Sequence, residues 1–315
     1  MTNDLYIPYL SGDTDIRPLP AGADFWSSPN VTLDSGPGGG AVDPSTYIPN
    51  NQQCLILVDV LDKNVQEGPF TIFVEVWVCD PATIVGPGSG LPISEGSSTN
   101  YLTGQSSVAG GSTTIKVYGF KPYPGMSSSP GGHACLIANC WGSRSEGPPV
   151  PSDGQSLIGS TTANFVSLVQ TDGHVAQHNI FSEAMSSGKR HLSFPFNAVA
   201  AVPRGEEKVV LEIQNKTGDS GLTKGDLSFL HKGPYRNLPL HTSKVPLKAF
   251  AIDGGPGGPA KHVPLELHAR HPIPLSILAE IGQGEQIGGV HRFDVIQKTI
   301  SGHVQGGIHL LAVIT

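Results

Sequence analysis

Phe70–Cys79 reads FTIFVEVWVC, and this stretch decides the fold class. Its side chains alternate about an extended chain, so that successive residues point to opposite faces. One face carries Ile72, Val74, Val76 and Val78, and the other carries Phe73, Glu75 and Trp77. Alternation of this kind, rich in β-branched and aromatic residues, is typical of a strand with one face in a core.

The same alternation recurs along the chain, between turns rich in glycine and proline. Further strands are expected at residues 26–33, 53–59, 113–120, 133–141, 175–181, 191–199, 207–215, 262–268, 275–281, 292–300 and 307–314. The last two form a predicted hairpin with Ser301-Gly302 as its turn. Because no helical period of ten residues is visible, the sequence predicts an all-β protein made of two tandem antiparallel β-sandwich domains of the immunoglobulin-like kind. The predicted core positions are Ile56, Val58, Ile72, Val74, Val76, Leu136 and Ala138.

The expected domain boundaries follow changes in composition. Residues 1–20 are polar and proline-rich, and are predicted to be an arm without a core of its own that lies on a neighbouring subunit. Residues 21–181 form the first predicted sandwich. Residues 182–190, SEAMSSGKR, are a polar joint, and the strand pattern restarts for a second sandwich over residues 191–315.

Composition excludes several classes of protein. Of the 315 residues, 40 are Gly, 27 are Pro and only 14% are charged, which argues against a helical bundle or coiled coil. The net charge is −7 and no Lys/Arg-rich run occurs, so neither nucleic acid nor an anionic membrane surface is an expected partner. Apolar runs reach about ten residues, too few for a membrane-spanning helix. Residues 1–20 lack a secretory-signal pattern, which leaves cytoplasm, cell surface and particle open as locations.

The four cysteines form no CxxC pair and have no zinc-binding spacing. All four, Cys54, Cys79, Cys135 and Cys140, lie in or beside strand patterns. We therefore expect buried small apolar side chains. The alternative is an inter-sheet disulfide between Cys54 and Cys135.

No catalytic, cofactor or metal site is predicted. The sequence has no GxSxG elbow and no local pair of catalytic carboxylates. His268 and His271 are expected on opposite faces of one strand, where they are poorly placed to chelate an ion. Asp13 and Asp15 fit an Asx-rich turn better than a calcium loop.

Histidines also follow the predicted final hairpin, at His291, His303 and His309. Two of them could meet across the strands and bind a metal or sense pH.

The three tryptophans differ in their surroundings. Trp77 lies between two valines and is expected in a sandwich core. Trp26 and Trp141 adjoin turns, and are the candidates for aromatic side chains that face a ligand.

Two segments resemble the last strands of bacterial immunoglobulin-like domains of the CARDB kind, which are adhesion-related modules. The matching residues are Gly132, His133, Cys135, Leu136 and Ala138, then Asp172, Val175, Ala176, Gln177, Asn179 and Ile180. DFWSSPNVTL at residues 24–33 also fits the first strand of such a domain, so the resemblance covers about residues 24–181. His178 stands where arginine is common in that family. The resemblance implies a β-sandwich but indicates little about a ligand.

We therefore expect a non-catalytic structural or protein-interaction protein, a subunit of a larger surface or particle assembly whose partners are other protein subunits in a homo-oligomer or polymer. The alternatives are a carbohydrate-binding module, a viral capsid protein and an enzyme of unrecognised type.

Overall fold

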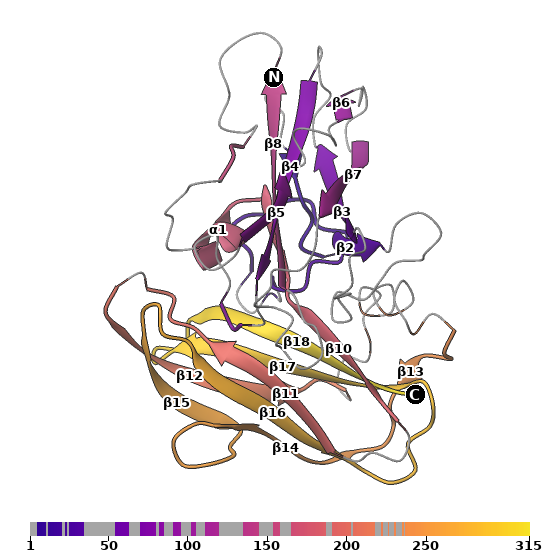
Figure 1. Cartoon of the computed structure of the whole chain (residues 1–315), viewed down its shortest axis with the longest axis vertical. Coiled ribbons are helices and arrows are strands. Elements are labelled where there is room, and N and C mark those ends of the chain that lie inside the picture. Colours follow the sequence, from indigo (N-terminus) through magenta and orange to yellow (C-terminus); the bar gives the residue numbers. More distant parts are fainter. Residues whose placement is uncertain are drawn as a thin grey trace.

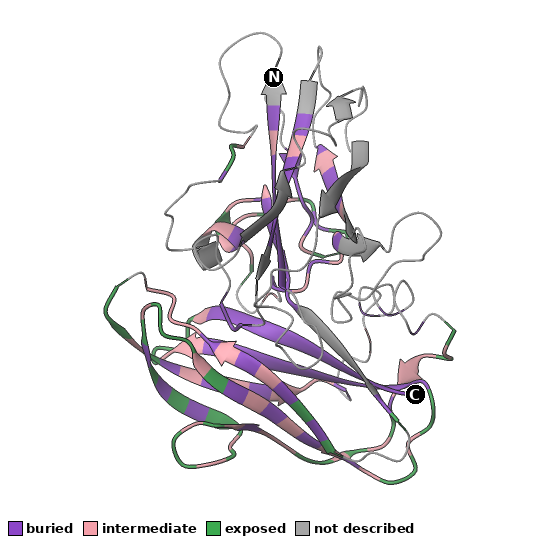
Figure 2. Cartoon of the chain, in the orientation of Figure 1, coloured by how far each residue is buried: buried purple, intermediate pink, exposed green. Residues whose placement is uncertain are grey.

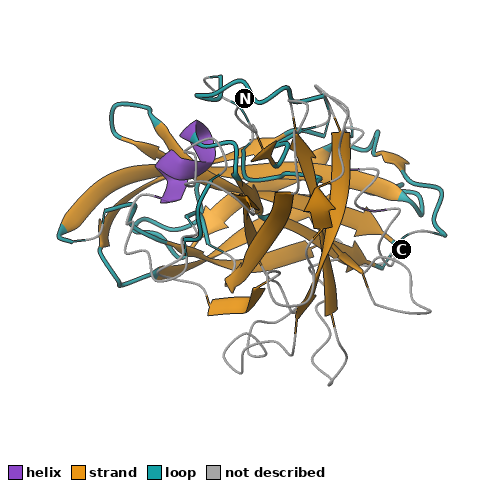
Figure 3. Cartoon of the chain, turned by 90° about the horizontal axis from the view of Figure 1, so that it is seen from above, coloured by secondary structure: helices purple, strands orange, loops and turns teal. Residues whose placement is uncertain are grey.

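The computed structural model describes residues 5–10, 12–20, 23, 25–34, 54–62, 70–79, 82–84, 91–95, 102–104, 111–119, 135–144, 154–157, 165–186, 191–202, 204–217, 222, 226, 230, 235 and 237–315. Nearly all regular structure in these residues is β-strand (Figure 3), which confirms the predicted fold class. The named helix, α1, spans Phe165–Thr171. Among the described residues, no helix has the length and apolar character needed to cross a membrane.

Strands β1 to β9 form two sheets, called here the N-terminal sheet pair (upper part of Figure 1). One sheet holds β1 (Leu5–Tyr6), β2 (Val31–Asp34), β3 (Cys54–Asp62) and β7 (Gly111–Gly119). The other holds β4 (Phe70–Cys79), β5 (Leu91–Glu95), β6 (Leu102–Gly104), β8 (Cys135–Arg144) and β9 (Val175–His178). A buried aliphatic cluster lies between them and confirms six of the seven predicted core positions, Val58, Ile72, Val74, Val76, Leu136 and Ala138. The side chain of Ile56 lies outside the described residues.

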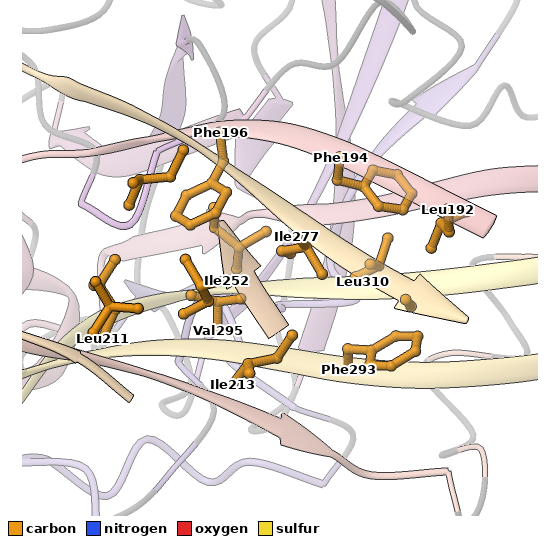
Figure 4. Packing of buried hydrophobic residues seen from close by; sticks show 14 of the residues in the cluster. Leu192, Phe194, Phe196, Leu211, Ile213, Ile252, Ile277, Phe293, Val295 and Leu310 are labelled. Carbon is orange, nitrogen blue, oxygen red and sulfur yellow. The ribbon is translucent and has the colours of Figure 1, made fainter. Parts of the chain in front are cut away.

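Strands β10 to β18 form the C-terminal sheet pair. Its larger sheet holds β10 (Ile180–Met185), β12 (Glu206–Asn215), β13 (His241–Thr242), β15 (His262–His268), β17 (Gly289–Thr299) and β18 (Val304–Ile314). Its smaller sheet holds β11 (His191–Ala198), β14 (Leu247–Asp253) and β16 (Ile273–Ile281). Figure 4 shows side chains from both sheets, such as Phe194, Ile277 and Phe293, meeting in the core between them.

The predicted final hairpin is present. Strands β17 and β18 pair antiparallel, and Gly302 takes a positive φ of 89° in the turn between them. The prediction of purely antiparallel sheets is wrong in two places, because β10 pairs parallel to β18 and β13 pairs parallel to β17.

The boundary between the sheet pairs differs from the predicted joint. Residues 180–185 form β10, and every residue of β10 pairs with β18. The part of the predicted joint at residues 182–185 is therefore a strand and not a linker. The chain passes from β9 to β10 through the single residue Asn179. The sequence could not reveal this crossing because residues 175–181 read as one continuous strand.

The N-terminal residues pack on their own chain, and the prediction of an arm without a core is wrong for the described part of residues 1–20. Leu5 and Ile7 are buried in the N-terminal core, and β1 pairs with the end of β3. The backbone amide of Leu19 also donates to the carbonyl of Gln170. The contact with a neighbouring subunit is predicted because residues 1–20 are expected to lack a core of their own. The packing of the described residues on their own chain removes that reason.

Strands β17 and β18 are buried on both faces along nearly their whole length, whereas β15 alternates between buried and exposed (Figure 2). The N-terminal sheet pair covers part of their outer face. Gly306 and Gly307 lie at this contact, where added Cβ atoms would fall 2.2 Å from the carbonyl oxygen of Thr83 and 2.7 Å from the Trp26 ring, respectively. Two successive glycines thus let the two sheet pairs approach closely.

We predict that Gly307→Ala lowers the free energy of unfolding by about 1–3 kcal/mol, since the new methyl group must displace the Trp26 ring. Urea unfolding followed by fluorescence measures the change. Ile300→Ala, at a residue that is 65% exposed, is the control and should stay within about 0.5 kcal/mol of the wild type. Equal stability of the Gly307 variant and the wild type would contradict the close contact.

Candidate functional site

A buried ionic cluster lies on the outer face of the β17–β18 hairpin. Asp294 and His309 are directly opposite each other, and His309 Nδ1 lies 2.9 Å from Asp294 Oδ1. On its other side, His309 Nε2 lies 3.1 Å from Asp226 Oδ1. Arg292 Nη1 lies 3.3 Å from Asp226 Oδ2, and its Nη2 lies 3.7 Å from Asp294 Oδ2. The cluster therefore ties the segment bearing Asp226 to the hairpin.

Charge pairing sets the protonation of this cluster. Burial by itself lowers the pKa of His309, but the carboxylates of Asp294 and Asp226 outweigh it and raise the pKa to about 9. Burial raises the pKa of Asp294, but the positive charges of His309 and Arg292 lower it by more, so that the net pKa lies below its usual value. At neutral pH the cluster holds two carboxylates against an imidazolium and a guanidinium. Since its side chains are at most 6% exposed, the cluster is an internal ion-pair network that holds the Asp226 segment to the hairpin.

A second buried histidine lies beside the crossing between the sheet pairs. His178 Nδ1 is 2.6 Å from the carbonyl oxygen of Ser28. Burial lowers the pKa of His178 to about 4, with a further lowering by the charge on His309. His178 and His309 thus differ in charge at neutral pH, with His178 neutral and His309 protonated.

The surface offers a different feature, an aromatic pair on the outer face of the β4–β8 ladder. Phe73 and Trp141 are directly opposite each other, and both are half-buried. Their rings stack with centroids 5.4 Å apart and an interplanar angle of 16°. Trp141 is therefore partly open to solvent, as expected for a side chain that could face a ligand.

Trp26 does not share this exposure, and its prediction as a ligand-facing residue is wrong. It is 1% exposed, packs edge-to-face on Phe25 and covers Gly307 of the C-terminal sheet pair. The neighbouring turn pointed to exposure, but the second sheet pair covers this position. Trp77 is buried as predicted, in a cluster on the face of β4 opposite the aliphatic core.

The disulfide between Cys54 and Cys135, which the sequence left open as an alternative, is not formed. Cys135 is a buried thiol that donates to Asn179 Oδ1, and the side chain of Cys54 lies outside the described residues. Cys140 is free and likewise buried, and burial raises the pKa of its thiol well above the usual value. These two cysteines are buried, as the strand pattern predicts.

The positions of His268 and His271 also differ from those predicted from the sequence. His268 and His271 form an antiparallel bridge across a two-residue turn, so they oppose each other instead of lying on opposite faces of a strand. His291 Nε2 lies 2.9 Å from Glu285 Oε2, and His303 is exposed in the hairpin turn, so these two do not join His309. Within the described ranges, no group of three His, Cys, Asp or Glu side chains is arranged to hold a metal ion.

The Asp13 carboxylate accepts the amide of Asp15 at 2.8 Å, an Asx turn as predicted, and Arg17 pairs with both acids.

The buried polar residues that form the ionic cluster and the hydrogen bonds between distant segments were not identified from the sequence. They are Glu75, Asn179, Asp226, Arg292 and Asp294. A charged or amide side chain inside an apolar strand pattern was the available signal for four of them, while Asp226 lies outside any strand.

Comparisons with known proteins give no family for the chain. No family model matches it, and no curated protein matches it, so the CARDB-like resemblance stays a prediction. Among solved structures, the chain is similar to the CupB6 tip adhesin from Pseudomonas aeruginosa, with 11% identity, a TM-score of 0.23, and coverage of 91% of this chain and 98% of that one. It is also similar to the collagen adhesin CNA from S. aureus, with 9% identity, a TM-score of 0.21, and coverage of 94% and 96%. At these scores the likeness carries no argument about function.

We predict that the ionic cluster makes stability fall in alkali. The pKa of His309 is about 9 in the folded chain and near 6.5 when unfolded, so its contribution is complete below pH 6.5 and lost as pH rises through 9. The free energy of unfolding should decrease by about 3 kcal/mol across this window. Urea unfolding at a series of pH values measures it.

Two variants separate this effect from other titrations. His309→Gln should flatten the decrease between pH 6.5 and 9, while His303→Gln, at an exposed position on the same hairpin, should keep it. A wild-type profile that is flat over this window would rule out a charged His309.

Proposed function

We propose that the chain is a non-catalytic structural or protein-interaction protein in which the two sheet pairs act as one stiff piece, a subunit of a larger assembly. The observation that carries this proposal is the crossing at Asn179. One fully buried residue joins the sheet pairs, and its side-chain amide donates to the carbonyls of Ala82 at 2.8 Å and Gly307 at 2.7 Å. A buried, hydrogen-bonded junction supports a fixed angle between the sheet pairs.

Assembly through three of the sheet edges is disfavoured by the edge strands themselves. Strands β5, β11 and β15 lie at the edges of three sheets, and each contains a proline: Pro92, Pro195 and Pro264. Proline cannot donate to a neighbouring strand, and edge prolines are a common protection against sheet-to-sheet pairing. We propose that the contact is made by the face of a sheet.

The outer face of the smaller C-terminal sheet fits this purpose. A shallow depression of about 350 Å³ lies over β11, β14 and β16, lined mostly by apolar atoms of residues that include Ala249, Ala251 and Leu278. His191 and Glu280 flank it, and Lys248 Nζ lies 3.1 Å from Glu280 Oε1. The patch carries both signs of charge around an apolar centre, which allows it to complement a second copy of itself across a two-fold axis. The proposed occupant is a second copy of this chain.

We predict that the purified chain self-associates and that Leu278→Asp abolishes this association, since the substitution places a charge in the centre of the depression. Size-exclusion chromatography with light scattering over a range of concentrations gives the mass. The wild type should rise above the 33.0 kDa of one chain, and Leu278→Asp should remain at that mass.

Ile300→Asp, which adds the same charge in the exposed hairpin turn, is the control and should associate like the wild type. A wild type that stays monomeric at every concentration would refute self-association, and equal association of the Leu278 variant would refute this face.

A further inference from the structure

The aromatic pair Phe73–Trp141 has a polar neighbour on the same face of the sheet. Two residues further along β4 and β8 lie Glu75 and Asn139, again directly opposite each other. Since residues two apart on a strand share a face, the aromatic pair and the polar pair form adjacent rows. The polar row is fully covered, whereas the aromatic row is half-buried.

Residues 154–157 provide this cover, and Glu75 holds them in place. Glu75 Oε1 accepts the side-chain amide of Asn139 at 2.8 Å and the backbone amide of Leu157 at 2.5 Å. Glu75 Oε2 accepts the hydroxyl of Ser156 at 2.8 Å. Asn139 Nδ2 also donates to the carbonyl of Gln155 at 2.8 Å. The short segment is therefore fixed at the border of the aromatic pair.

Burying a carboxylate is costly unless hydrogen bonds satisfy it, and Glu75 is 0% exposed. An apolar residue at this position would extend the apolar surface around Trp77 without that cost. The carboxylate instead orders a segment whose Gln155 and Ser156 side chains are exposed. A buried charged group that fixes exposed polar side chains beside an aromatic surface is the arrangement of a built binding site.

The side chains exposed on this surface indicate which class of ligand it can bind. A partly exposed aromatic pair offers a flat apolar contact, and the adjacent Gln155 amide and Ser156 hydroxyl offer neutral donors and acceptors. The carboxylate that holds this segment, Glu75, is covered. A ligand that fits has one apolar C–H face, a rim of hydroxyl groups and no charge.

We propose that this surface binds a neutral saccharide, with the C–H face of a pyranose ring on Trp141 and its hydroxyl groups on Gln155 and Ser156. The pair Phe73–Trp141 sets the orientation of the indole, and Glu75 acts as a positioning residue for the polar segment. This site is separate from the self-association face of the smaller C-terminal sheet, so each proposal can fail without the other.

Isothermal titration calorimetry of the full chain tests the proposal, with β-linked hexasaccharides of glucose, mannose, xylose, galactose and N-acetylglucosamine as the probes. At least one probe is expected to bind at up to millimolar concentration. Trp141→Ala should lower the association constant of that probe by about tenfold or more, because the stacking surface is lost. Trp141→Phe should keep most of the affinity, and Gln155→Ala should reduce it by about threefold to tenfold.

Tyr9→Ala is the matched control, since Tyr9 is also a half-buried aromatic residue and lies in the segment between β1 and β2. Its affinity should equal that of the wild type. Thermal unfolding of each variant identifies any that fails to fold, in which case Gln155→Ala, at an exposed side chain, decides the outcome. Absence of binding for all five probes would overturn the proposal, as would equal affinity of the wild type and the folded Trp141 and Gln155 variants.

Discussion

The fully bonded Asn179 is the constraint on which the rest of the structure depends. Its backbone amide donates to the carbonyl of Trp26 at 2.6 Å, and its carbonyl accepts the amide of His309 at 3.0 Å. Its side chain donates to Ala82 and Gly307 and accepts from the thiol of Cys135. Because it is 2% exposed, any of these groups left without a partner would lose the hydrogen bonds that water supplies to the unfolded chain. One residue thereby fixes where the chain leaves one sheet and enters another.

The other buried features follow from this fixed crossing. The N-terminal sheet pair lies against β17 and β18, which explains why these strands are buried on both faces and why glycines stand at residues 306 and 307. Further along the same outer face, His309 and Asp294 hold the segment that carries Asp226. An apolar cluster that includes Leu230 and Tyr235 completes the cover. Polar and apolar contacts thus alternate along one hairpin.

Local sequence patterns predicted what depends on local geometry. The alternation in Phe70–Cys79 indicated the core face of β4, and the Ser301-Gly302 turn indicated the final hairpin. Counting outward from that turn places residue 294 opposite residue 309, so the Asp294–His309 pair was within reach of the sequence. The crossing at Asn179 and the burial of Trp26 were not, because both depend on which distant strands pack together. A turn beside a tryptophan does not indicate whether another sheet covers it.

Differential scanning calorimetry of the wild type and Asn179→Ala tests most directly whether the two sheet pairs are one cooperative piece. The account predicts a single transition for the wild type, with equal calorimetric and van't Hoff enthalpies. Asn179→Ala should show two separate transitions, because the buried carbonyls of Ala82 and Gly307 lose their donor and the junction weakens. Two transitions in the wild type, or an unchanged single transition in the variant, would contradict the central role of this residue.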